Sequence, residues 1–85
     1  WRSEIDRIDE QLVKLLAERQ RIVEHIIGVK KASNLPARIP ARVDHVLDHV
    51  RALAVNYRVD PQLVETIWTE MVEWFIAHEE RQLGS

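Results

Sequence analysis

With 85 residues, the chain is long enough for one domain and marginal for one compact core. Its formal charge of −2 provides no basic footprint for nucleic acid, and the absence of cysteine excludes disulfides and cysteine-type zinc sites. No apolar run approaches the ~20 residues of a membrane span, and no signal peptide is visible, so we expect a cytoplasmic protein that binds neither membranes nor nucleic acid.

The first helix is expected from about Ser3 to Lys31, because apolar residues recur there at spacings of three and four. They form a heptad seam made of Ile5, Ile8, Leu12, Leu15, Ile22, Ile26 and Val29. We expect Gly28, inside this helix, to mark close packing. At ~1.5 Å per residue the helix is about 40 Å long or more, whereas a globule of 85 residues is about 25–30 Å across. We therefore predict a homodimer packed along this helix.

Residues typical of a loop follow the first helix. Ser33-Asn34, Pro36 and Pro40 predict a loop from Ala32 to Pro40. Pro40 can occupy the first turn of a second helix that runs to about Asn56. The apolar stripe of this helix is Val43, Val46, Leu47, Val50 and Leu53.

A third helix is expected to start after Asp60, an N-cap residue followed by Pro61, and to run to about Gln82. Its inward residues are expected to be Val64, Ile67, Trp68, Met71, Val72, Phe75 and Ile76. The sequence has no alternating run of β-branched residues, so no strand is predicted. The prediction is an all-α fold with three helices per chain, a long first helix and a single domain over residues 1–85.

Arg19 occupies the one seam position where the heptad pattern calls for a hydrophobic residue. A guanidinium keeps its proton and is costly to remove from water, so it implies a counter-charge inside the fold. Nine of the twelve cations are arginine, a bias that suits forked recognition of carboxylate or phosphate.

Further charges lie on apolar faces. Lys30 is eleven residues after Arg19, within about 20° of three full turns, so both project from one helix face roughly 16 Å apart. Arg42 lies beside the apolar stripe of the second helix, and Glu79 continues the apolar stripe of the third. Arg2 is about 100° around the helix from Arg19, so a neighbouring chain would have to supply it to the same pocket.

This set of charges predicts a pocket for a compact molecule with more than one carboxylate, since Glu79 can match only one of the cations. The alternative is that Arg19 and Lys30 extend to the rim and pair with surface acids such as Glu18 or Glu24.

The histidines give weaker signals. His45 and His49 share a helix face that could hold a metal, but no third ligand is evident, so we expect a solvated face and no metal. We interpret His78 as a surface or interface residue. No Ser/His/Asp set, phosphate loop or Gly-rich fingerprint is present.

One helix carries the pattern Arg2-x-x-Ile5-Asp6-x-Ile8-Asp9-x-x-Leu12-x-x-Leu15-Leu16-x-x-Arg19, and Lys30 follows it. The segment Ile39-Pro40-Ala41-Arg42-Val43 opens the next helix, and Trp74-Phe75-Ile76-Ala77 precedes Glu79. With these residues the chain resembles the all-helical chorismate mutase family (type II), which includes related isochorismate-pyruvate lyases. The resemblance covers essentially the whole chain.

The resemblance implies an intertwined homodimer with two equivalent pockets and no cofactor. Arg19, together with Arg2 of the other chain, would bind the carboxylates of the substrate. Lys30 would bind a carboxylate and the ether oxygen, Arg42 would lie near the ring, and Val72 and Phe75 would line the pocket. Glu79 would be the fourth catalytic residue, beside Arg19, Lys30 and Arg2. The implied reaction converts chorismate to prephenate, on the route to phenylalanine and tyrosine.

Three positions depart from the mutase pattern. Many mutases have a glutamine at the position of Glu79 that donates a hydrogen bond to the ether oxygen, and a glutamate must be protonated to do so. Val43 stands where a glutamate contacts the ring hydroxyl, and Ile39 stands where an aspartate is common. The last two are more similar to isochorismate-pyruvate lyase, which makes salicylate and pyruvate. The mutase is the main hypothesis, with the lyase as the alternative enzyme and a non-catalytic binding module or a bare dimerisation domain as further alternatives.

Overall fold

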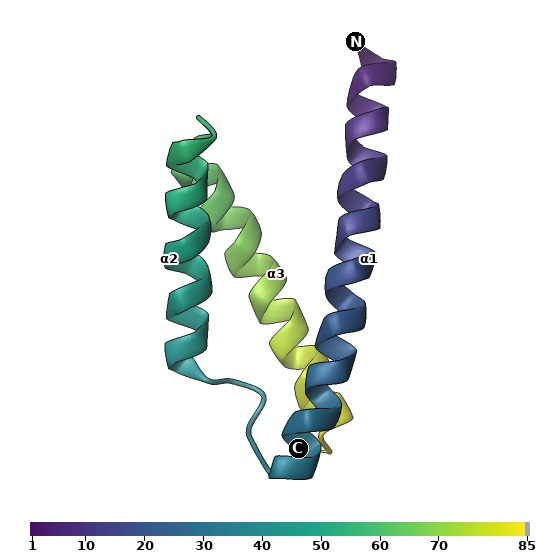
Figure 1. Ribbon diagram of the computed structural model, residues 1–85, viewed down its shortest axis with the longest axis vertical. Helices are drawn as coiled ribbons and strands as arrows, with labels where there is room; N and C mark the ends of the chain where they lie inside the picture. Colours follow the sequence, from purple (N-terminus) through teal and green to yellow (C-terminus); the bar gives the residue numbers. More distant parts are fainter. Residues whose placement is uncertain (85) are drawn as a thin grey trace.

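Three helices joined by short connections account for nearly all of residues 1–84, the part of the chain that the computed structural model describes. They are α1 (Arg2–Ser33), α2 (Pro40–Asn56) and α3 (Pro61–Gln82) (Figure 1). Residues 1–84 contain no strand, so the predicted all-α class and the number of helices are confirmed.

The end of α1 differs from the prediction, because Ala32 and Ser33 are helical and the loop begins only at Asn34. Asn34 adopts the left-handed conformation with φ 57°, and its backbone N–H reaches the carbonyls of Lys30 and Lys31. Asn tolerates this conformation better than most residues, so it ends the helix in place of glycine. The two lysines of the last turn also favour the negative end of the helix dipole.

The starts of α2 and α3 agree with the prediction. Pro40 is the first residue of α2 after an extended Ile39, and Pro61 is the first residue of α3. The side chain of Asp60 accepts a hydrogen bond from the backbone N–H of Gln62 at 2.9 Å. This contact satisfies one of the backbone donors that a helix start leaves unpaired.

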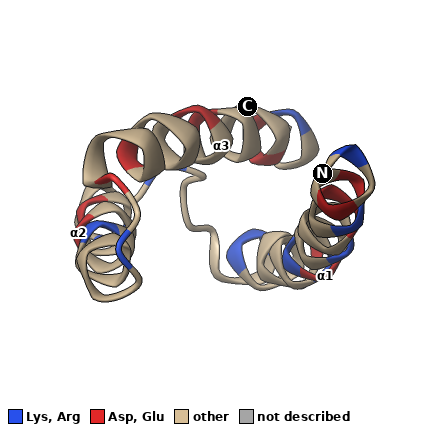
Figure 2. Ribbon diagram, turned by 90° about the horizontal axis from the view of Figure 1, so that it is seen from above, with Lys and Arg blue, Asp and Glu red and all other residues tan. Residues whose placement is uncertain are grey.

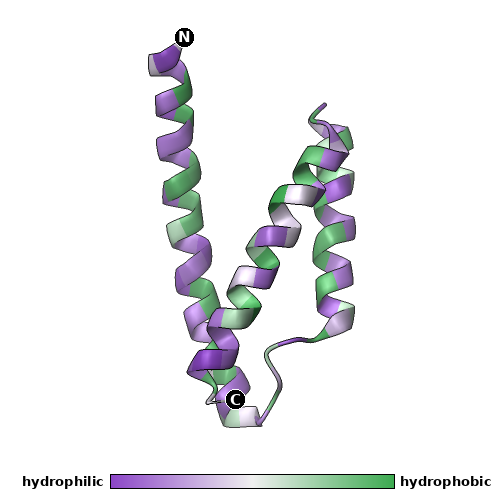
Figure 3. Ribbon diagram, turned by 180° about the vertical axis from the view of Figure 1, so that it is seen from behind, coloured by the Kyte–Doolittle hydropathy of each residue, from purple (hydrophilic) through white to green (hydrophobic). Residues whose placement is uncertain are grey.

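Helices α2 and α3 pack against each other, whereas α1 approaches α3 near one end and stays away from α2 within the described chain. From above, α3 lies between the other two helices, so the three form an open arc (Figure 2). From the side, α1 and α3 diverge as the two arms of a V (Figures 1 and 3). The core is accordingly small, with Ala37, Val72 and Ile76 buried together and Val43, Val46 and Leu83 packed against them.

Most of the hydrophobic seam of α1 is left in solvent within one chain. Its apolar members, Ile5, Ile8, Leu12, Leu15, Ile22, Ile26 and Val29, are 40–62% exposed. Figure 3 shows hydrophobic residues along the whole of α1, including the arm that no other helix covers. The residue of α1 that is buried is Ile27, which lies outside the seam.

Two details of the predicted packing are wrong for a single chain. Ile67 is 46% exposed rather than inward. Close packing does not explain Gly28, because a Cβ added there would meet nothing within 4 Å. Gly28 is nine residues from Arg19, which places it on the opposite side of α1 from the seam.

Candidate active site

The pocket that holds the predicted site residues has a volume of about 300 Å³ and lies where α1 and α3 meet, beside the start of α2. The end of α1, the loop after it, the start of α2 and the last turns of α3 all contribute to its wall. The lining residues are Arg19, Val23, Ile26, Lys30, Ala37, Ile39, Arg42, Val43, Val46, Val72, Phe75, Ile76 and Glu79.

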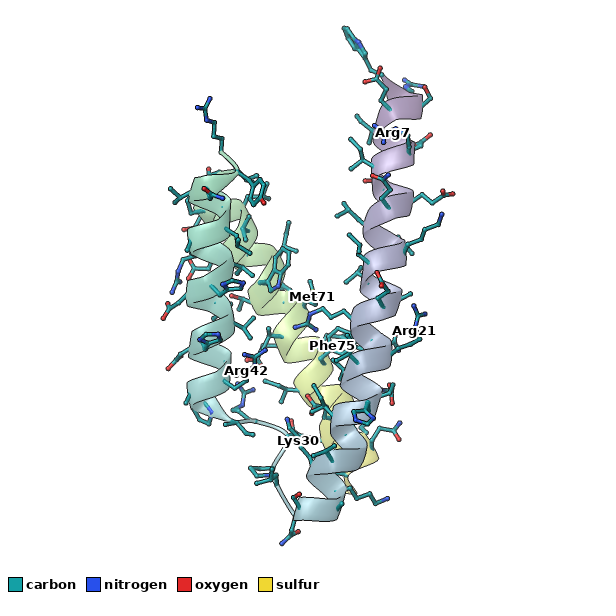
Figure 4. The ribbon with its side chains drawn as sticks, viewed as in Figure 1. Arg7, Arg21, Lys30, Arg42, Met71 and Phe75 are labelled. Carbon is teal, nitrogen blue, oxygen red and sulfur yellow. The ribbon has the colours of Figure 1, made fainter. Side chains whose placement is uncertain are left out.

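Six of the seven predicted site residues line this one pocket: Arg19, Lys30, Arg42, Val72, Phe75 and Glu79. Lys30, Arg42 and Phe75 come from three different helices and lie around the same space (Figure 4). The seventh, Arg2, is exposed at the other end of α1, about 25 Å along the axis from Arg19. Within one chain, Arg2 is therefore not part of the pocket.

Lys30 and Glu79 form an ion pair in the pocket wall. Nζ of Lys30 donates to Oε1 of Glu79 at 2.8 Å and to the carbonyl of Ala37 at 2.8 Å. Glu79 is only 7% exposed, so its carboxylate is held away from bulk water. A buried charge is tolerated when it is paired in this way, and the pair also ties α1 to α3 and to the loop before α2.

Arg19 lies over the face of Phe75, with its Cζ 5.1 Å from the ring centroid. This cation–π contact stabilises the guanidinium at an apolar wall. However, Nη1 of Arg19 is buried and has no hydrogen-bond partner within residues 1–84. A buried donor without a partner costs free energy, so the site is suited to an acceptor that comes from outside the chain.

The electrostatic surroundings of Arg19 also favour an acceptor from outside the chain. Burial lowers the pKa of Arg19, the positive charge of Arg42 lowers it further, and Glu79 acts in the opposite direction. Arg42, in the first turn of α2, forms none of the ion pairs found in the described part of the chain. Positive charge is thus in excess around the pocket, since the nearby carboxylate of Glu79 is already bonded to Lys30.

The rest of the pocket lining is apolar. Ile39, Val43 and Val46 come from the start of α2 and the residue before it, and Val72 and Ile76 come from α3. The lining contains no hydroxyl, thiol or imidazole side chain. The arrangement can hold a small anionic molecule against a hydrophobic surface and place fixed positive charge beside it, but offers no side-chain nucleophile of the serine, cysteine or histidine kind.

Sequence reasoning missed two polar features near the site. The carbonyl of Ala37 bonds Lys30, and only the path of the loop brings it there. His78 is not a simple surface residue, because its Nε2 lies 2.6 Å from Oε1 of Glu24 and its side chain is only 16% exposed. The two residues are far apart in the sequence, so no local spacing could have indicated their contact.

The remaining predicted features lie outside the pocket. His45 and His49 stack with ring centroids 6.1 Å apart. Residues 1–84 contain no cluster of three or more His, Cys, Asp or Glu side chains able to hold a metal ion. In that same stretch, none of the helices has the length and apolar character needed to cross a membrane.

Comparison with known proteins identifies the family. Residues 1–80 match the family described as chorismate mutase type II. A chorismate mutase of Methanocaldococcus jannaschii is 29% identical over 72 residues, which cover 85% of this chain and 73% of that protein. A bifunctional chorismate mutase/prephenate dehydratase of Aquifex aeolicus is 38% identical over 52 residues, which cover 61% of this chain and 14% of that much longer protein. With the match spanning nearly its whole length, this chain belongs to the chorismate mutase type II family.

Proposed function

We propose that this protein converts chorismate to prephenate, by an isomerisation that uses no cofactor and forms no covalent intermediate. The observation that carries the proposal is the buried Nη1 of Arg19, which lacks a partner within residues 1–84 and borders the pocket. A carboxylate of the substrate would supply the acceptor. The family match and the relatives named for this activity support the choice of substrate.

The reaction is a Claisen rearrangement, in which the ether C–O bond breaks while a C–C bond forms. All atoms stay in the molecule, and negative charge develops on the ether oxygen in the transition state. The protein must therefore hold a flexible dianion in its folded conformer and place positive charge where the charge develops. A pocket that combines an apolar wall with fixed cations suits both tasks.

Each polar residue takes a separate role in this proposal. Arg19 binds a carboxylate, and Arg42 lies nearer the ring. Lys30 binds a carboxylate and the ether oxygen, supported by its bonds to Glu79 and to the Ala37 carbonyl. In its ionised form Glu79 orients Lys30; in its protonated form it can itself donate to the ether oxygen. Val72 and Phe75 pack against the apolar part of the substrate.

The active unit in this proposal is a homodimer in which Arg2 of one chain completes the pocket of the other. The main support is the exposed seam of α1, because seven large hydrophobic residues in one heptad register call for a partner helix. The open V between α1 and α3 is a second support. Its α3 arm carries Leu63, Ile67 and Trp74, all about half exposed in a single chain.

The alternative enzyme activity is cleavage of isochorismate to salicylate and pyruvate. One observation favours it: Ile39 and Val43 are part of the pocket wall and offer no polar group to a ring hydroxyl. A site that hydrogen-bonds a hydroxyl discriminates strongly for it, whereas an apolar wall does not. Relaxed recognition of the hydroxyl position would allow both substrates to bind.

A parallel assay with the two substrates tests the proposal. We expect loss of chorismate absorbance with prephenate as product, and a slower or absent release of salicylate fluorescence from isochorismate. Faster salicylate formation would reverse the assignment of the two activities. Binding of either compound without turnover would indicate a non-catalytic module, and the absence of both binding and turnover would indicate a dimerisation domain.

A further inference from the structure

A chain of side-chain contacts leaves α1 at Glu24 and returns to α1 at Arg19. Nε2 of His78 lies 2.6 Å from Oε1 of Glu24. The ring of Trp74 stacks on His78 with centroids 5.3 Å apart and an angle of 15° between the planes. Trp74 meets Phe75 edge to face at 5.1 Å, and Arg19 lies over Phe75.

The position of this chain of contacts relates it to the pocket. Glu24 follows Val23, and His78 precedes Glu79, and both of these neighbours line the pocket. The pair formed by Glu24 and His78 therefore joins α1 to α3 outside the pocket lining, one residue along each helix from a residue that lines it. Because α1 approaches α3 over a short stretch and stays away from α2, few other contacts fix its distance from the rest of the chain.

The ion pair between Lys30 and Glu79 also joins the two helices, but it lies inside the pocket. A substrate carboxylate or ether oxygen that binds Lys30 must share or replace this contact. The Glu24–His78 pair lies outside the lining, so a ligand in the pocket can bind without replacing this contact. It is the contact that can keep the separation of α1 and α3 constant while Lys30 interacts with substrate.

We propose that His78, held by Glu24, is a positioning residue: the pair fixes α1 against α3 and, through Trp74 and Phe75, sets the place of Arg19 in the pocket. This inference rests on the proposed mutase function for its effect on catalysis. Arg19 holds a substrate carboxylate and so keeps the substrate in its reactive conformer; a small displacement of its guanidinium misaligns the reacting atoms and lowers kcat more than it raises KM.

Four variants and a control test the kinetic part. His78→Leu and Glu24→Leu each remove the contact, and we expect kcat to fall on the order of tenfold to 100-fold with KM nearly unchanged. The double variant should be no worse than either single variant, because both remove one shared contact. His78→Gln keeps a side-chain N–H donor for Glu24 and should recover most of the wild-type kcat. Arg51→Leu breaks a 2.6 Å pair with Glu65 that joins α2 to α3 away from the pocket, and it should leave kcat unchanged.

The geometric part has a readout that needs no substrate. The chain contains no cysteine, so Arg21→Cys on α1 and Glu70→Cys on α3 provide unique sites for spin labels. Labelled chains are diluted with unlabelled chains, so that only distances within one chain are measured. We expect a narrow distance distribution in the wild-type background and with His78→Gln, and a broad or shifted one with His78→Leu or Glu24→Leu.

The outcomes separate this inference from the proposed function. Lack of chorismate turnover by the wild-type protein would refute the function, and the spin-label distances would still test whether the pair positions α1. Unchanged distances with His78→Leu and Glu24→Leu would overturn the inference. A changed distance with wild-type kcat, or additive losses in the double variant, would overturn it as well.

Discussion

Nζ of Lys30 lies 2.8 Å from Oε1 of Glu79, so the buried carboxylate of the pocket is matched by one cation and the charge of Arg19 is left over. This imbalance suits the pocket to an anionic ligand. A substrate with two carboxylates would correct it, whereas an uncharged molecule of the same size would leave the guanidinium without its acceptor.

Glu79→Gln tests how the buried carboxyl takes part in the reaction. A glutamine amide donates a hydrogen bond at every pH, but a glutamate donates only when it carries a proton. If Glu79 donates to the ether oxygen, the kcat of the wild-type protein falls as the pH rises, and the variant has a flat profile. The variant should then be the faster enzyme in alkaline solution. Two superimposable pH profiles of kcat would show that Glu79 does not act as a donor.

Leu15→Glu tests the seam of α1 as a dimer interface. Leu15 is 59% exposed in one chain, so a carboxylate there has little effect on the stability of a monomer. Within a packed seam the same carboxylate would be buried, at a large cost in free energy. We expect sedimentation equilibrium to give the mass of a single 10.0 kDa chain, together with loss of turnover. Val13→Glu is the matched control, because Val13 is similarly exposed and lies about 200° around the helix from Leu15. Equal effects of the two substitutions would argue against the seam.

Mixing two inactive variants tests whether Arg2 acts on the pocket of the other chain. In a hybrid dimer of Arg2→Ala and Arg19→Leu chains, one pocket keeps both arginines and the other loses both. Unfolding and refolding an equal mixture should therefore restore activity, to about a quarter of the wild-type pockets by random pairing. Each variant refolded alone should stay inactive. A mixture no more active than its components would show that Arg2 does not complete the partner's site.

The exposed pair of Arg38 and Glu73 predicts a pH-dependent contribution to stability. Hydrogen bonds from Arg38, at 2.9 and 2.6 Å, hold the pKa of Glu73 below its ordinary value of 4.5. A depressed pKa in the folded state contributes stability above the unfolded-state pKa, and this contribution is lost as the pH falls through the folded-state pKa. Arg38→Gln should lower the urea midpoint at neutral pH and have no effect in strong acid. Arg7→Gln, at another exposed arginine, is the control; a deficit of Arg38→Gln that persists in strong acid would contradict the assignment.

Much of the fold follows from local sequence signals. Pro40 and Pro61 start helices where their fixed φ and missing N–H are tolerated, and Asp60 caps the second of them. The end of α1 was predicted less well, because the left-handed conformation of Asn34 depends on the following loop as well as on its own side chain. Local rules therefore predict the three helices and the ends of α2 at Asn56 and of α3 at Gln82, but not the last turn of α1.

Helical register alone was sufficient to predict part of the grouping of the candidate site residues. Arg19 and Lys30 are found on one face of α1, and Glu79 is found on the inner face of α3, as their spacings indicated. Register does not show which residues of different helices meet. The contact of Glu24 with His78 and the bond from Lys30 to the Ala37 carbonyl depend on how α1 crosses α3, which no spacing within one helix specifies.

The most direct test of the account is the rate of chorismate loss measured for the wild-type protein and for Arg19→Leu, with the product identified by NMR. Arg21→Leu, on the outer side of the same helix (Figure 4), is the control. We expect Arg19→Leu to keep its helical circular dichroism and its resistance to urea, because an apolar residue replaces a partly buried charge. Its kcat/KM for prephenate formation should fall by roughly 100-fold to 1,000-fold or more, while Arg21→Leu stays near wild type. Prephenate formation at the wild-type rate by a folded Arg19→Leu protein would contradict the account.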